Sequence, residues 1–298
     1  MRPSLTPLLA SLLLPCALSA QGFVAGAPLP SNANTKTFGS FLAAESVTHD
    51  VQNDRYIVVN TGVRNAAIPN DGYISLLNPD GSVHTLKWIA PTPTNGVTLN
   101  DPRGSHLHKG TLYIADIDTV RLFDLATGAP KETHIIPGTL LLNDLTVAAD
   151  GTIYVTESGN TEPATHKVYK IAPGGQPVVF ASGPRIIRPN GIALDNDGNL
   201  VVLVLGSNEV FTFSPAGELL KTETSTDAGN DGIAILADGT KLISSVQQGK
   251  IARIRPGQPA EVIATGIPNA ASMAYDAKRN QLVIPQNQQN AVTILQLR

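Results

Sequence analysis

Apolar and polar positions repeat along this chain as one phrase, in which an oxygen-bearing residue opens a short apolar run that turns and continues into a second apolar run. Three copies turn at Asp-Gly, and they open at Asn143 (NDLTVAADGTIYVTES), Asn190 (NGIALDNDGNLVVLV) and Asp231 (DGIAILADGTKLISS). Apolar runs on both sides of Asp-Gly are a strong signal for a β-hairpin. Because the three hairpins keep one phase, the pattern indicates an internal repeat.

Looser copies of the phrase extend the repeat toward both ends of the chain. The six opening residues are Glu45, Arg103, Asn143, Asn190, Asp231 and Ser272. They recur at intervals of about 40 to 60 residues, and no segment shows sustained helical periodicity. Units of about 40 residues with four strands each are typical of propeller blades. The pattern therefore predicts an all-β, six-bladed β-propeller, whereas two packed β-sandwiches would not explain the common phase.

The last repeat is shorter than the others, with room for three strands after Ser272. We expect the N-terminal segment 35–42 to supply the missing fourth strand. Such a strand closes the ring and covers the edges that an open sheet would expose. The predicted single propeller domain spans residues 33–298, after a small, Pro-rich linker at residues 21–32.

The first twenty residues, MRPSLTPLLASLLLPCALSA, combine one Arg, an apolar stretch and small residues. This order is typical of a secretory signal peptide. A membrane anchor is the alternative, although the stretch is short and interrupted by Pro7 and Pro15. We expect cleavage after Ala20, a secreted or periplasmic protein, and no membrane span in the mature chain. Cys16 is the single cysteine, so the mature chain would use neither disulfides nor thiol chemistry.

The composition narrows the classes of function. The chain has 298 residues, of which 42% are hydrophobic, enough to bury a full core. Its net charge is −3 and it has no basic run, which argues against nucleic acid as a partner. Neither G-x-S-x-G nor H-E-x-x-H occurs, which removes the usual serine-hydrolase and zincin interpretations. We expect a monomer that acts on or binds a small molecule.

Four of the opening residues are oxygen donors: Glu45, Asn143, Asn190 and Asp231. In a propeller the innermost strands line a central channel, so residues that open these strands converge at one mouth of it. Two carboxylates and two amide carbonyls suit Ca²⁺, which takes about 6–8 oxygen ligands in irregular geometry. No set of thiolates or imidazoles suggests zinc or copper. The alternative is that these residues cap turns and bond to the backbone.

Arg103 occupies the same position in the second blade. It would bind a substrate carboxylate or stabilise an oxyanion, or else form a salt bridge to Asp101 or to a carboxylate at the mouth. His106 and His108 share a strand face, but no third ligand is evident near them, so an exposed or turn-bonding pair is the preferred interpretation.

The phrases AESVTHD, LNDLTVAADGTIYVTES, RPNGIALDNDG and NDGIAILADG resemble the senescence-marker-protein/gluconolactonase family of six-bladed propellers, and more distantly the paraoxonases. The resemblance runs from about Glu45 to the C-terminus. It implies one divalent metal, usually calcium, at the channel mouth, and hydrolysis of lactones. By motif, Glu45, Asn190 and Asp231 would be direct ligands, and Asn143 would ligate the metal or hold a metal-bound water or the substrate. Asp231 would also be the general base.

One position departs from the family's pattern. Similar gluconolactonases place an Arg that holds sugar hydroxyls two residues before the Asn-Asp pair, where this chain has Leu141. This implies a less polar substrate, or no turnover. The leading hypothesis is metal-dependent hydrolysis of a lactone or related ester. The alternatives are a non-enzymatic protein that binds a ligand or partner around a structural metal, and a lyase that uses the same mouth.

Overall fold

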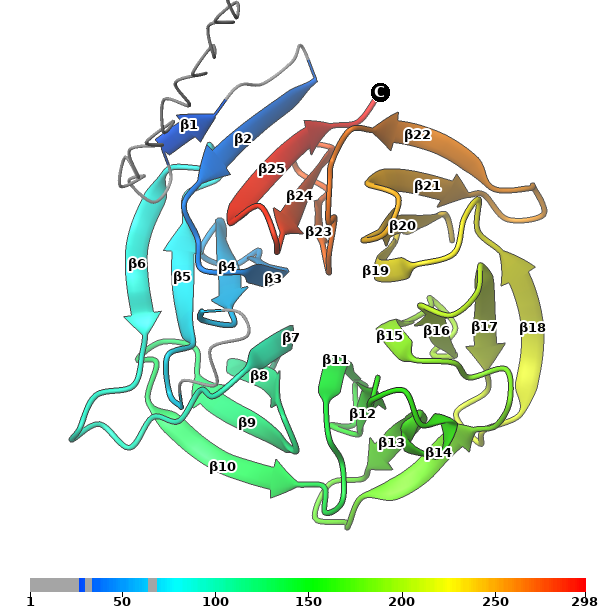
Figure 1. The fold of residues 1–298 in the computed structure, drawn as a ribbon, viewed down its shortest axis with the longest axis horizontal. Helices are drawn as coiled ribbons and strands as arrows, with labels where there is room; N and C mark the ends of the chain where they lie inside the picture. The colour runs from blue at the N-terminus through cyan, green and yellow to red at the C-terminus, as the bar shows by residue number, and fades with distance from the viewer. Residues whose placement is uncertain (1–26, 30–33, 64–68) are drawn as a thin grey trace, which may run out of the picture.

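The computed structural model describes residues 27–29, 34–63 and 69–298, which form six antiparallel sheets around a central channel (Figure 1). Five sheets have four strands and the sixth has five. This confirms the predicted all-β, six-bladed propeller. Within the described residues the only helical element is the short 3₁₀ helix η1 (Pro163–Thr165). No helix in this part of the chain is long and apolar enough to cross a membrane.

Each blade runs from an innermost strand at the channel to an outermost strand at the rim (Figure 1). The innermost strands are β3 (Ala44–Asp50), β7 (Pro102–His108), β11 (Leu142–Val147), β15 (Pro189–Leu194), β19 (Asn230–Ile235) and β23 (Ala274–Asp276). The second strands are β4 (Arg55–Asn60), β8 (Thr111–Asp116), β12 (Ile153–Glu157), β16 (Leu200–Val204), β20 (Lys241–Ser245) and β24 (Gln281–Gln286). The third strands are β5 (Tyr73–Leu77), β9 (Thr119–Asp124), β13 (Lys167–Ile171), β17 (Glu209–Phe213), β21 (Lys250–Ile254) and β25 (Ala291–Gln296). The fourth strands are β6 (Val83–Ile89), β10 (Pro130–Ile135), β14 (Val178–Ser182), β18 (Leu219–Thr224), β22 (Glu261–Thr265) and, in the sixth blade, β2 (Thr35–Gly39).

The N-terminal strand β2 completes the sixth blade, as the sequence predicts. It pairs antiparallel with β25, from Thr35 opposite Leu295 to Gly39 opposite Ala291. A further strand, β1 (Ala27–Leu29), pairs with the outer edge of β2. β1 lies within residues 21–32, where the composition suggests a linker, so part of that segment is a strand that extends the blade. The predicted signal peptide at residues 1–20 lies outside the described residues.

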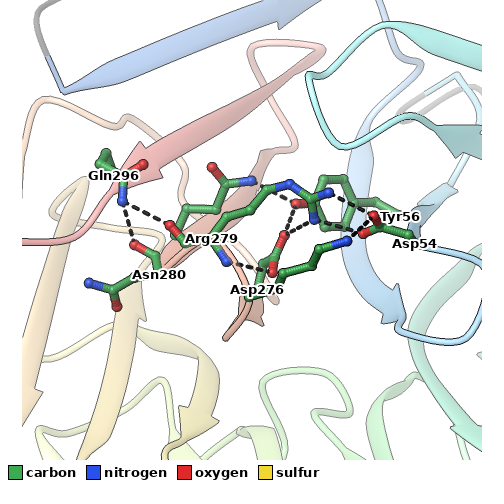
Figure 2. A network of polar contacts seen from close by, with 8 residues as sticks. Asp54, Tyr56, Asp276, Arg279, Asn280 and Gln296 are labelled. Atoms are coloured by element: carbon green, nitrogen blue, oxygen red, sulfur yellow. Dashed lines mark hydrogen bonds and ion pairs between the residues drawn. The ribbon is translucent and has the colours of Figure 1, made fainter.

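A polar network fastens the sixth blade to the first (Figure 2). Arg279, in the β23–β24 turn, donates from both terminal nitrogens to the carboxylate of Asp54, in the β3–β4 turn, at 2.7 Å each. It also donates to Asp276 at 2.8 Å, and the Tyr56 hydroxyl donates to the same Asp276 oxygen at 2.6 Å. Burial alone would raise the pKa of Asp276, but the bonds from Tyr56 and Arg279 lower it below its usual value. We call these four residues the seam network.

The core lies between blades rather than inside one of them. The second strands are largely buried because each face packs on a neighbouring blade; β16 reads LVVLV and is buried throughout. Between the first two blades, Ile57 and Ile74 pack with Leu112 and Phe123. Each such side chain stabilises the fold by about 1.5–3 kcal/mol. The blades therefore hold one another in a ring, and the innermost strands define the channel.

Candidate functional site

The opening residues lie at irregular points of the innermost strands. In β7, Pro102 pairs with Asp116 and Ser105 pairs with Ile114, so β7 carries one extra residue around Arg103. The same shift in register occurs in β3, β11, β15 and β19, at the opening residue each time. A β-bulge bends its strand and redirects a side chain away from the regular ladder. Five opening residues are thus released to make contacts between blades.

Glycines let adjacent innermost strands approach closely at this level. A Cβ on Gly191, directly after Asn190, would lie 2.0 Å from the backbone oxygen of Asp231. A Cβ on Gly232, directly after Asp231, would lie 2.6 Å from the Cα of Ser272. No side chain fits in either space. The close contact brings the opening residues of the fourth, fifth and sixth blades together.

Arg103 bridges two carboxylates at the mouth. It donates from Nη1 to Oε1 of Glu45 at 3.1 Å and from Nη2 to Oδ2 of Asp101 at 2.9 Å. The second oxygen of Glu45 accepts a hydrogen bond from Nδ2 of Asn287 at 2.6 Å. Burial alone would lower the pKa of Arg103, but Glu45 and Asp101 raise it above its usual value, so the guanidinium stays charged. The sequence suggests two salt bridges for Arg103, one to Asp101 and one to a carboxylate at the mouth, and both are present.

Asn190 and Asp231 form the second contact between opening residues. Nδ2 of Asn190 donates to Oδ2 of Asp231 at 3.0 Å, and both residues are buried. The amide oxygen of Asn190 is also buried and has no hydrogen-bond partner among the described residues. Burial raises the pKa of Asp231 well above its usual value, and repulsion from Glu45 and Asp144 raises it further, while Arg103 partly opposes them.

Asn143 makes a different contact from the other opening residues. Its Nδ2 donates to the hydroxyl of Ser158 at 2.9 Å, and that hydroxyl donates to the backbone oxygen of Pro189 at 2.7 Å. Asn143 is thereby tied to the fourth blade through Ser158. Its Oδ1 is not committed to this contact.

Ser272 contacts Asp144, the residue after Asn143. Its hydroxyl donates to Oδ2 of Asp144 at 2.9 Å, although the two residues belong to the sixth and third blades. Burial raises the pKa of Asp144 to about 7, against the hydrogen bonds that it accepts from Ser272 and the backbone of Leu145. This bond therefore crosses the channel next to the opening residues.

The donor set at the mouth fits a hard divalent cation. Three carboxylates lie close enough to repel one another, those of Glu45, Asp144 and Asp231. The charge of Arg103 offsets only part of this repulsion. The amide oxygen of Asn190, which accepts no hydrogen bond from the described residues, adds a neutral acceptor beside Asp231. Within the described residues no three His, Cys, Asp or Glu side chains are grouped closely enough to hold a metal by themselves. Amide oxygens would have to complete the ligand set, as they commonly do for calcium.

A cavity of about 350 Å³ lies among the innermost strands, next to the opening residues. Asp144 and Ser272 lie at its boundary with the mouth, and His49 and His106 line its walls. Burial lowers the pKa of His106 to about 4, so this imidazole is neutral. His108 does not line the cavity, so the two histidines that share a strand face in the sequence do not form a joint site there.

Sequence reasoning missed three buried polar residues that contact or adjoin the opening residues. Asn287 is held against Glu45 and has a buried amide oxygen without a partner in the described part of the chain. It follows the second strand β24, so it has no place in the phase of the repeat. Asn230 is fully buried, and neither of its side-chain polar atoms has a partner among the residues described. Asp144 and Asn230 are each adjacent to an opening residue, so examining the neighbouring positions of each copy would have found them.

Comparison with solved structures agrees with this architecture, whereas no curated protein matches the chain. One similar structure is described as a putative gluconolactonase, with 16% identity, a TM-score of 0.66, and coverage of 90% of this chain and 93% of the other. Another is XC5397 from Xanthomonas campestris, described as a gluconolactonase, with 18% identity, a TM-score of 0.65, and coverage of 91% and 95%. Virginiamycin B lyase from Staphylococcus aureus has 15% identity, a TM-score of 0.61, and coverage of 91% and 94%. At these identities the likeness shows the fold.

The family comparison covers most of the propeller. The chain matches the family described as SMP-30/Gluconolactonase/LRE-like region over residues 68–286. The match begins after Glu45 and ends at Gln286, the last residue of β24, so it includes the other five opening residues. The chain therefore belongs to the SMP-30/gluconolactonase/LRE-like family.

Proposed function

We propose that this protein is a divalent-metal-dependent hydrolase of a lactone or related ester, with calcium as the metal. The observation that carries the proposal is the pairing of Asn190 with Asp231 at the channel mouth. There an amide oxygen that has no partner within the described part of the chain lies beside a carboxylate already repelled by its neighbours. A cation would relieve that repulsion and satisfy the amide oxygen. Membership of a gluconolactonase-like family supports the lactonase assignment.

The residues at the mouth divide the chemistry between them. A cation held by Glu45, Asn190 and Asp231, with Asn143 as a further ligand or as the holder of a water, would polarise the lactone carbonyl. Asp231 would take a proton from the attacking water, whose oxygen bonds to the carbonyl carbon. The ring C–O bond then breaks, and the proton passes from Asp231 to the leaving alkoxide. The product is a hydroxy acid, formed by the net addition of one water.

The rim beside the mouth favours a substrate with an apolar part. Leu140 and Leu141 directly precede β11, and Leu140 is 48% exposed. Ile187, just before β15 in the next blade, is 39% exposed. Leu141 occupies the place where the resemblance leads us to expect a sugar-binding Arg. We therefore propose an alkyl-substituted lactone or an ester of similar polarity, rather than a sugar lactone.

The test is a panel of lactones and esters, graded from sugar lactones to alkyl-substituted lactones, assayed with calcium and with a chelator. Asp231→Asn should abolish turnover at every calcium concentration, because it removes the base. Glu45→Gln should weaken calcium binding yet recover activity at high calcium. Asp227→Asn is the matched control, because Asp227 lies in the loop before β19 and pairs with Lys250 rather than with the mouth.

Each outcome of this test separates the alternatives. Turnover that persists in chelator would contradict the metal dependence. Calcium binding without turnover on any substrate would favour the non-enzymatic alternative, in which the ion is structural or holds a ligand. A product with the same mass as the substrate would indicate elimination by a lyase, because hydrolysis adds one water.

A further inference from the structure

Arg103 holds the place of a cation at the channel mouth. Its guanidinium lies between Glu45 and Asp101, at 3.1 and 2.9 Å, and its side chain is only 17% exposed. Asp231 also attracts it, and together these carboxylates keep it charged despite its burial. A positive charge is thus built into the same cluster of acidic groups that would receive a metal.

Both oxygens of Glu45 already accept hydrogen bonds. Oε1 accepts from Arg103 and Oε2 accepts from Asn287. Each oxygen keeps a second lone pair, so a cation that coordinates Glu45 would share the carboxylate with these two donors. The bond to Arg103 is the one that a cation would oppose, because two positive charges would share one carboxylate oxygen.

Asn190 and Asp231 differ from Glu45 in this respect. The amide oxygen of Asn190 has no partner among the described residues, and the contact between the two residues uses the amide nitrogen of Asn190 and only one oxygen of Asp231. These groups can receive a cation without losing a bond to Arg103. Of these three candidate ligands, Glu45 is therefore the one at which the cation and the guanidinium compete.

We propose that Arg103 competes with the divalent cation for Glu45, so that cation binding moves the guanidinium off Glu45 while Asp101 retains it. The inference rests on the metal dependence proposed above, and it adds a residue that sets the affinity for the metal. Asp101 is suited to hold the displaced guanidinium, because its side chain is 34% exposed and so gives the pair room toward solvent. The released guanidinium edge then becomes available to an anionic group of a substrate.

The experiment is calorimetric titration of calcium into chelator-treated protein. It compares the wild type, Arg103→Met, Glu45→Gln and the double variant, which together form a double-mutant cycle. Arg103→Met should lower the Kd for calcium at least ~10-fold, because the competing charge is gone. In the Glu45→Gln background the same substitution should change the Kd less than ~3-fold, because the shared carboxylate is absent.

Two further variants keep the result interpretable. Arg185→Met is the matched control, since Arg185 forms an exposed ion pair with Glu209 at 2.6 Å and should leave the Kd unchanged. Arg103→Lys replaces the methionine variant if that one does not fold. Lysine keeps the charge but cannot present two nitrogens to two carboxylates, so the Kd of this variant should be lower than that of the wild type.

The outcomes distinguish this inference from the proposed function. A Kd that is unchanged or raised in Arg103→Met overturns the competition and leaves the metal site standing. An equal gain in the Glu45→Gln background also overturns it, because the effect would then be one of general charge. Saturable binding by Arg103→Met and not by the wild type supports it in its strongest form. No saturable binding by any variant refutes the metal dependence, and the competition with it.

Discussion

Gly191→Ala tests whether close contact between blades holds the mouth in shape. The added Cβ would lie 2.0 Å from the backbone oxygen of Asp231, where ordinary contact begins at 3.4 Å. The strands β15 and β19 must therefore separate by about 1.4 Å, since backbone cannot rotate away as a side chain can. Overpacking of this kind costs about 1–3 kcal/mol. We expect about 3 kcal/mol here, because the obstacle is backbone in a buried strand.

Equilibrium unfolding in urea measures this loss through the midpoint of the transition. Gly175→Ala is the control: Gly175 lies in the turn between β13 and β14, and the three atoms nearest to its added Cβ all belong to Ala172, at 3.1 Å or more. It should change stability by less than about 0.5 kcal/mol. A midpoint for Gly191→Ala equal to that of the control would refute the reasoning. Calcium affinity should fall as well, because Asn190 and Asp231 adjoin the strained contact.

Three other perturbations test the seam network, the buried acid and the closing strand. Arg279→Met should destabilise the fold by about 3 kcal/mol in thermal or urea unfolding, because it leaves the carboxylate of Asp276 buried without its cation. Because the pKa of Asp144 is raised to about 7, the stability that this residue contributes without metal should be present below about pH 4 and lost by about pH 7. In chelator, the free energy of unfolding of Asp144→Asn should therefore rise relative to that of the wild type over this range, by at most about 4 kcal/mol. Deletion of residues 35–39 should expose the edge of β25 and give an aggregating product by size-exclusion chromatography, and a soluble monomer would contradict the role of β2.

The fold could be predicted from the sequence because each blade repeats the same local signals. The Asp-Gly turns at Gly151, Gly198 and Gly239 place three hairpins at the same phase of the repeat. The last repeat is too short for four strands, which indicates that a strand from elsewhere in the chain completes it. β1 could not be predicted in this way, because it has only three residues, Ala27–Leu29, and lies within a Pro-rich segment without an apolar repeat.

The site could be predicted only in part. The opening residues were identifiable because they share one position in the repeat. Asn287 was not, because it follows a second strand instead of opening an innermost one, and it contacts Glu45 only through the closure of the ring. The partner of Arg103 was also undetermined, since the choice between substrate and carboxylate depends on distances between blades. Contacts across blades depend on the whole ring, and no local pattern records them.

Closure through β2 and β25 has a consequence for how the chain folds. These strands come from opposite ends of the described chain, so their pairing brings together residues such as Thr37 and Thr293 that are far apart in sequence. Contacts of such high sequence separation form slowly, because loop-closure entropy is lost before they are gained. Five blades can assemble from consecutive segments, whereas the sixth forms only when the N-terminal strand β2 pairs with the C-terminal strand β25. A circular permutant joined between β25 and β2 would make the sixth blade from consecutive strands, and its folding rate would show whether closure is the slow step.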